Sequence, residues 1–177
     1  MHKLGLSALL ALAFALPAAA QDTPSAMATF IGLDGAELGS VTLTQAEGAV
    51  SITGEVMGLT AGNHGIHFHE TGDCDGAAAF ESAGGHFNPT DHQHGLENPE
   101  GAHAGDLPNL AIAAEATTQI DFSSDLISLT EGDPAYVFDQ DGTALVIHAG
   151  EDDQMTDPSG NSGDRLACAV IEANTAP

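Results

Sequence analysis

The chain has 177 residues, of which 26 are Asp or Glu and 2 are Lys or Arg, so its formal net charge is −24. Such a charge repels phosphate backbones and anionic lipids, which argues against a nucleic-acid-binding protein and against a membrane-surface protein. The 42% hydrophobic content supplies a core and argues against intrinsic disorder, while 2 cysteines are too few for a disulfide-dense miniprotein.

The first 20 residues have the layout of a secretory signal peptide. A positive charge at Lys3 precedes an apolar run over residues 4–16, and small residues suited to cleavage follow it. This run is shorter than the roughly 20 apolar residues that a membrane-spanning helix needs. We therefore expect removal of residues 1–20 and export of residues 21–177 as one domain.

Short strands separated by turns fill most of the remaining chain. Each predicted strand is rich in β-branched residues or alternates apolar with polar residues, and Gly, Pro, Asp or Asn bounds it. No stretch sustains an amphipathic helical period. Frequent turns and about eight strands predict an all-β fold, an eight-stranded Greek-key flattened barrel or an immunoglobulin-like β-sandwich. The predicted strands are residues 26–33, 38–44, 50–59, 66–69, 110–116, 119–122, 144–148 and 167–171.

Two long segments, 69–107 and 149–164, resist assignment to strands. Ordered loops of this length are uncommon in a compact domain unless they serve function. The sequence shows no internal repeat and no linker. It therefore predicts one domain with two long functional loops.

Histidines lie at the edges of these two segments. His67 and His69 are two residues apart on a predicted strand, so both rings point to the same face. Imidazole suits copper and zinc, and three imidazoles with one carboxylate form a tetrahedral zinc set. Each histidine alone is equally compatible with a solvated surface residue, whereas the whole set predicts a metal centre. The other candidate ligands are His86, His94, His103, Asp106 and His148.

Several ordered motifs extend this pattern over nearly the whole mature chain, from about residue 26 to residue 172. Together with His94, their sequences and spacing resemble those of the copper/zinc superoxide dismutases, and specifically the bacterial exported branch of that family. The resemblance implies the same β-sandwich fold, which agrees with the strand pattern. The motifs are Gly-Ile-His-Phe-His-Glu at 65–70, Ser-Ala-Gly-Gly-His-Phe-Asn-Pro at 82–89, His-Ala-Gly-Asp-Leu at 103–107, Leu-Val-Ile-His at 145–148 and Gly-Asp-Arg-Leu-Ala-Cys at 163–168.

The resemblance implies one copper ion and one zinc ion per subunit. His86 would bridge both ions, since two metal charges favour the loss of both ring protons. The implied copper ligands are His67, His69, His86 and His148. The implied zinc ligands are His86, His94, His103 and Asp106.

The implied activity is disproportionation of superoxide to dioxygen and hydrogen peroxide, with copper alternately reduced and oxidised and with His86 as proton carrier. Arg165 matches the family's channel arginine, which attracts and orients superoxide. Its alternative role is a structural ion pair. Asp152 matches a carboxylate that links a copper ligand to a zinc ligand. Its alternative role is that of a solvated loop acid.

Export to an oxidising space also predicts a disulfide between Cys74 and Cys168, in place of two free thiols. The bacterial exported branch implies a periplasmic protein, either a monomer or a homodimer, that acts on superoxide and binds neither nucleic acid nor membrane. The alternative function is an exported copper/zinc-binding or delivery protein without turnover.

Segment 149–164 departs from the family pattern because it contains no lysine. Family members usually guide superoxide with positive residues there, whereas the mature chain would have only Arg165. Guidance would come from the metal ions and Arg165, within a Debye length of about 8 Å. We therefore expect a rate that depends weakly on salt or rises with it. His64 and His92 receive no metal role, the first as a hydrogen-bonded residue and the second as a solvated one.

Overall fold

The computed structural model describes residues 23–114 and 117–174, so the expected signal peptide at 1–20 lies outside the described residues. Within the described ranges, no helix has the length and apolar character of a membrane span. Two short 3-10 helices, η1 (Gly76–Ala78) and η2 (Glu81–Ala83), accompany the strands. The strands are β1 (Ser25–Gly32), β2 (Glu37–Ala46), β3 (Ala49–Val56), β4 (Gly62–His64), β5 (Ile66–His69), β6 (Leu110–Ile112), β7 (Thr118–Ser124), β8 (Ala144–His148), β9 (Arg165–Val170) and β10 (Glu172–Ala173).

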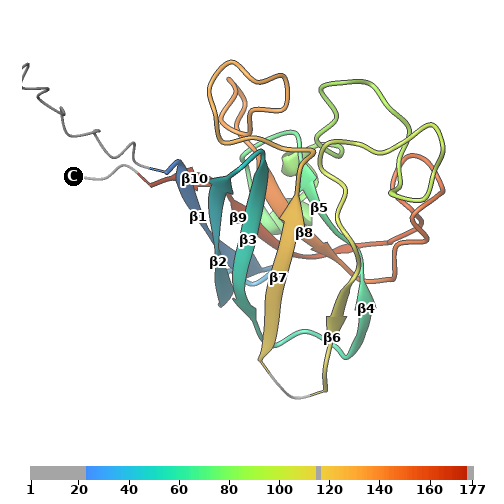
Figure 1. Ribbon diagram of the computed structural model, residues 1–177. Helices are drawn as coiled ribbons and strands as arrows, with labels where there is room; N and C mark the ends of the chain where they lie inside the picture. Colours follow the sequence, from blue (N-terminus) through green and yellow to red (C-terminus); the bar gives the residue numbers. More distant parts are fainter. Residues whose placement is uncertain (1–22, 115–116, 175–177) are drawn as a thin grey trace, which may run out of the picture.

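The main sheet is antiparallel, with the strand order β5-β8-β9-β1-β2-β3-β7, and β10 pairs with β1. The sheet curls, so that β5 and β8 lie behind the front strands β3 and β7 (Figure 1). In β1, buried Ala26, Ala28 and Phe30 alternate with more exposed residues, as a strand with one face on a core requires. The predicted all-β fold, a Greek-key flattened barrel or β-sandwich, is confirmed, and the structure shows it as one curled antiparallel sheet.

Strands β5 and β8 carry histidines on one face of the sheet. Side chains alternate between the two faces along each strand, which explains this placement. They pair antiparallel, with Phe68 opposite Leu145. Phe68 and Leu145 belong to the main hydrophobic core, as do Ile66 and Ile147. The intervening residues point to the other face of the sheet, which places His67 there. Apolar packing on one face therefore fixes the histidines on the other.

Three irregular segments connect the strands around this face. The histidine loop (70–109) joins β5 to β6, the core loop (125–143) joins β7 to β8, and the acidic loop (149–164) joins β8 to β9. In Figure 1 the histidine loop and the acidic loop lie side by side at the right of the molecule, and hydrogen bonds join them. The two predicted long loops are therefore confirmed.

The strand predictions differ from the structure at several points. The strand predicted over 50–59 ends at Val56, because Gly58 has a positive φ of 78°. The strand predicted over 110–116 ends at Ile112 and pairs with β4, which was not predicted because three residues are too few to show alternation. The core loop was not foreseen as a third long segment. It packs apolar side chains of its own, including Ile127 and Val137, into the main hydrophobic core.

Candidate metal centre

Four imidazoles converge on one face of the β5–β8 pair, and we call His67, His69, His86 and His148 the strand group. Three of them come from β5 and β8, and His86 joins through an isolated bridge to His69. The Nε2 atoms of His69 and His148 are 3.3 Å apart, and the ring centroids of His67 and His86 are 4.1 Å apart. All four are buried, and one ring nitrogen of each lies within 4.8 Å of the others.

A second set, which we call the loop group, consists of His86, His94, His103 and Asp106, all in the histidine loop. Their candidate ligand atoms also lie within 4.8 Å of one another. The Oδ1 atom of Asp106 is 3.1 Å from Nδ1 of His86, 2.9 Å from Nδ1 of His94 and 3.6 Å from Nδ1 of His103. Its Oδ2 atom accepts the backbone N–H groups of Gly95 and His103 at 2.8 and 3.0 Å. One carboxylate thus organises the loop group.

Gly105 anchors the histidine loop against the strand that carries His67 and His69. Its carbonyl accepts the N–H of Phe68 at 2.9 Å, and its N–H donates to the carbonyl of Phe87 at 2.8 Å. A Cβ atom at this position would collide with the carbonyl oxygen of Phe68. Only glycine allows this close approach of two backbones.

His86 belongs to both groups and turns a different nitrogen to each. Its Nδ1 faces Asp106, while its Nε2 is buried and has no hydrogen-bond partner among the described residues. The Nδ1 atom of His67 is also buried and without a partner within those residues. Buried nitrogens normally have partners, so the two atoms fit ligands of a cation. Four imidazoles suit copper, and three imidazoles with one carboxylate suit zinc.

Asp152 of the acidic loop connects the two groups. Its Oδ2 lies 2.6 Å from Nε2 of His67, and its Oδ1 lies 3.0 Å from Nε2 of His94. The side chain of Asn109 accepts the N–H of Asp152 and donates to its carbonyl, both at 2.8 Å. Gly160 packs so tightly on the carboxylate that a Cβ there would overlap it. Asp152 is therefore a fixed, buried partner of two histidines and not a solvated acid.

The electrostatics of the two groups differ. Burial lowers the pKa of His86 to about 4 and that of His148 to about 3, and it lowers the pKa values of His67 and His69. These rings are neutral at pH 7, as metal binding requires. Burial also disfavours the charged form of His94, but hydrogen bonds to Asp106 and Asp152 outweigh it and raise the pKa of His94 to about 9. The strand group is thus neutral, whereas the loop group carries charge.

Arg165 begins β9 and is held by the histidine loop. Its Nη1 and Nη2 atoms donate to the carbonyls of Phe80 and Gly84 at 2.6 and 2.7 Å. The Gly84 carbonyl also lies 3.0 Å from Nδ1 of His69. The carboxylate of Glu81 is 3.8 Å away, with its side chain 75% exposed. The guanidinium therefore lies next to a member of the strand group, and its short hydrogen bonds go to carbonyls instead of carboxylates.

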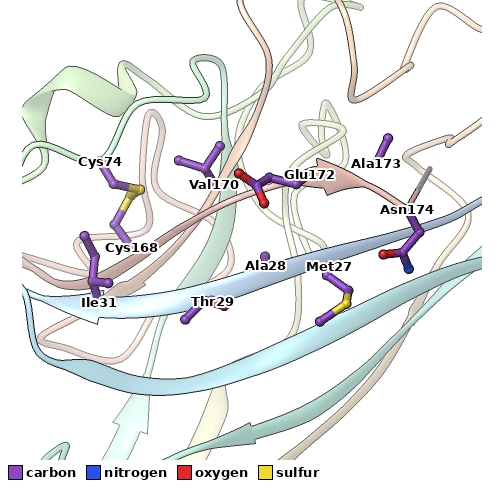
Figure 2. Close-up of a pocket in the computed structure, with 10 residues that line it drawn as sticks. All are labelled: Met27, Ala28, Thr29, Ile31, Cys74, Cys168, Val170, Glu172, Ala173 and Asn174. Carbon is purple, nitrogen blue, oxygen red and sulfur yellow. A yellow bond between two sulfur atoms is a disulfide. The ribbon is translucent and has the colours of Figure 1, made fainter. Parts of the chain in front are cut away.

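The disulfide predicted between Cys74 and Cys168 is confirmed, with the two Cα atoms 5.7 Å apart. It ties the histidine loop to β9, the strand that begins with Arg165. Figure 2 shows it at one end of a hollow that extends along β1 to Asn174. No lining residue of this hollow belongs to the strand group or the loop group.

The two histidines without a predicted metal role are outside both groups. His64 is buried, and its ring lies 2.7 Å from the carbonyl of His148 and 3.0 Å from that of Thr60, as expected of a hydrogen-bonded residue. His92 is exposed. Sequence reasoning missed Asn109 and Asp157, which the structure places against Asp152 and His94, because Pro-Asn and Asp-Pro pairs are typical of ordinary turns.

Comparison with known proteins agrees with this geometry. The family model for copper/zinc superoxide dismutase matches residues 37–171. The chain belongs to this family. Its relatives include the superoxide dismutase (Cu-Zn) of Caulobacter vibrioides, 44% identical over 151 residues that cover 84% of this chain and 86% of the relative. Another is superoxide dismutase (Cu-Zn) 2 of Aquifex aeolicus, 40% identical over 147 residues, covering 82% and 85%.

The copper/zinc superoxide dismutase fold also appears among solved structures. The crystal structure of a SOD-like protein from Bacillus subtilis matches with a TM-score of 0.76 and 36% identity, covering 81% of this chain and 96% of that one. The clock protein EA4 matches with a TM-score of 0.71 and 34% identity, covering 89% and 99%. The resemblance inferred from the motifs is thereby confirmed.

Proposed function

We propose that the chain is a superoxide dismutase that converts superoxide to dioxygen and hydrogen peroxide with one copper and one zinc ion per subunit. The strand group, His67, His69, His86 and His148, would hold copper. The loop group, His86, His94, His103 and Asp106, would hold zinc. The observation that carries this proposal is His86, whose two ring nitrogens serve one group each and whose buried Nε2 lacks a partner among the described residues.

The metal ions, His86 and Arg165 would have different roles in the reaction. When bound, copper supplies the one-electron chemistry, and zinc supplies positive charge without redox activity. Nε2 of His86 is the atom that would hold and release a proton, because its Nδ1 faces Asp106. Arg165, fixed by two carbonyls, would attract and orient the superoxide anion.

The alternative is an exported copper/zinc-binding or delivery protein without turnover. One relative, 44% identical over 110 residues, is the superoxide dismutase-like protein YojM of Bacillus subtilis. A delivery protein needs ligands but does not need a cation beside them. The presence of two complete donor sets and of Arg165 beside His69 supports turnover in this chain.

We further propose that residues 1–20 direct export to the periplasm. The Cys74–Cys168 disulfide supports an oxidising compartment. Both donor sets lie within one chain, so a monomer and a homodimer would be equally competent. The net charge of −24 supports the expectation that neither nucleic acid nor anionic membrane is a partner.

The decisive experiment measures superoxide decay after the purified protein has been loaded with copper and zinc. We expect decay to accelerate in proportion to the loaded protein, whereas the zinc-only protein has no effect. Stoichiometric binding of both metals with no acceleration would overturn the proposal in favour of delivery.

A further inference from the structure

We propose that Asp157 of the acidic loop is a positioning residue for zinc, because one of its carboxylate oxygens anchors the backbone of His94 and faces the ring of His103. This inference rests on the proposed function, because it concerns the zinc ligands of that site. Asp157 lies outside both groups, and the sequence motifs gave it no role.

The ring nitrogens that face away from the two groups show a regular pattern. Four of the five unshared histidines have an oxygen partner for this nitrogen, which is how metal-bound imidazoles are commonly oriented. For His67 and His94 the partner is Asp152, at 2.6 and 3.0 Å. For His69 and His148 it is a backbone carbonyl, at 3.0 and 3.1 Å.

His103 is the fifth unshared histidine, and its outward nitrogen faces Asp157. Its Nε2 atom is 3.7 Å from Oδ1 of Asp157. The same Oδ1 accepts the backbone N–H of His94 at 2.8 Å. A single oxygen atom therefore accepts a hydrogen bond from the backbone of one zinc ligand and lies near the ring of another.

The position of Asp157 does not depend on these two contacts alone. The N–H of Glu97 donates to the carbonyl of Gln154 at 3.1 Å, and the side-chain amide of Asn98 donates to the carbonyl of Met155 at 3.1 Å. Figure 1 shows the two loops side by side. Because other hydrogen bonds hold the loops together, the carboxylate can be changed without separating them.

Two substitutions separate the contributions of Asp157. In Asp157→Asn the side chain keeps an oxygen that can accept the N–H of His94, but it loses the negative charge that faces His103. We expect zinc affinity to fall about 10-fold, the lower end for an outer partner of a metal ligand, because the Asp157 side chain is 42% exposed. Asp157→Ala also loses the acceptor, and we expect a fall of up to about 100-fold.

The experiment measures zinc transfer from the copper- and zinc-loaded protein to a chelator at equilibrium. A second readout is the absorption spectrum of Co²⁺ placed in the zinc position, which reports the geometry of the ligands themselves. Glu97→Gln is the matched control, because Glu97 is an exposed acid of the histidine loop that belongs to neither group. Thermal unfolding of each metal-free variant measures any change in folding.

The expected result is weaker zinc binding in the order Asp157→Ala, Asp157→Asn, Glu97→Gln, with an altered Co²⁺ spectrum in the first two and unchanged metal-free unfolding in Asp157→Asn. Zinc affinity and spectrum of Asp157→Asn equal to those of Glu97→Gln would overturn the inference while leaving the proposed function intact. A wild-type protein that binds copper but neither zinc nor Co²⁺ would overturn both.

Discussion

The strand group and the loop group share His86 but are built in different ways. His67, His69 and His148 stand on paired strands whose opposite face is packed in the core. His94 and His103 stand on irregular chain, and hydrogen bonds to Asp106 hold them. Sheet packing thus positions the strand group, whereas a buried carboxylate positions the loop group.

The electrostatics follow the same division. Burial keeps the rings of the strand group neutral, with lowered pKa values. In the loop group, hydrogen bonds from the histidines hold the pKa of Asp106 far below its usual range. Hydrogen bonds to Asp106 and Asp152 raise the pKa of His94 to about 9. The first group is ready for a metal ion, whereas in the second a metal ion must displace a proton.

Removing the shared ring should have the largest effect, because it damages both groups. In His86→Ala, we expect activity to fall by more than about 100-fold, beyond the range for outer partners of metal ligands. Metal analysis should show both ions bound more weakly. His92→Ala is the control, since His92 is exposed and outside both groups. Normal activity in His86→Ala would disprove the shared role.

Removing the carboxylate that connects the two groups should have the second largest effect. Asp152→Asn removes a carboxylate that faces His67 and His94, and we expect a loss of about 10- to 100-fold in metal affinity or activity. Competition with a chelator measures the affinity of each variant for each metal. Glu151→Gln is the neighbouring control, because Glu151 belongs to neither group and its carboxylate accepts a hydrogen bond from exposed Asn63. Equal behaviour of the two variants would mean that Asp152 does not connect the groups.

Zinc binding to the metal-free protein should release a proton from His94. The pKa of this ring is about 9, above the unperturbed 6.5, so it is protonated at pH 7 and must lose that proton to become a ligand. We expect zinc affinity to rise about tenfold per pH unit between pH 7 and pH 9 and to level off above. Calorimetry in two buffers of different ionisation enthalpy counts the proton. An affinity that does not change over this range would contradict the prediction.

A smaller effect should follow from changing the charge next to Arg165. Glu81 lies 3.8 Å from Arg165 and offsets part of its charge. For Glu81→Gln we expect kcat/KM to rise by less than about fivefold, as suits an exposed ion pair worth up to about 1 kcal/mol. Glu97→Gln is the control, because it tests whether removal of any exposed carboxylate raises kcat/KM to the same extent. A decrease in Glu81→Gln would show that Glu81 supports Arg165 and does not oppose it.

The smallest effect should be that of salt on the wild-type protein. Its net charge of −24 repels superoxide at long range, whereas Arg165 and the metal ions attract it locally. Salt screens the longer interaction more strongly. We expect kcat/KM to stay level or rise slightly with ionic strength, measured from superoxide decay. A steep fall would show that positive charge dominates the approach.

The sequence analysis named the members of both groups, but a local pattern supports only part of the strand group. Alternation with a period of two puts His67 and His69 on one face whatever the rest of the chain does. The assignment of His94 and His103 came from motif resemblance, because no local period relates residues in a loop. Asn109 and Asp157 were missed, since their partners are 43 and 63 residues away in sequence.

The same distinction applies to the fold. Strands with alternating burial, such as β1, were predicted to within a few residues. The three-residue β4 and the core loop were not, because their structure depends on contacts with β6 and with the hydrophobic core. Long-range contacts of this kind leave no periodic pattern in the sequence.

The most direct measurement is anomalous diffraction, at the copper and zinc absorption edges, from crystals of the loaded protein. Our account predicts a copper peak within the strand group, a zinc peak within the loop group and the imidazole of His86 between them. Two peaks that share no ligand, or both metals found within one group, would contradict it.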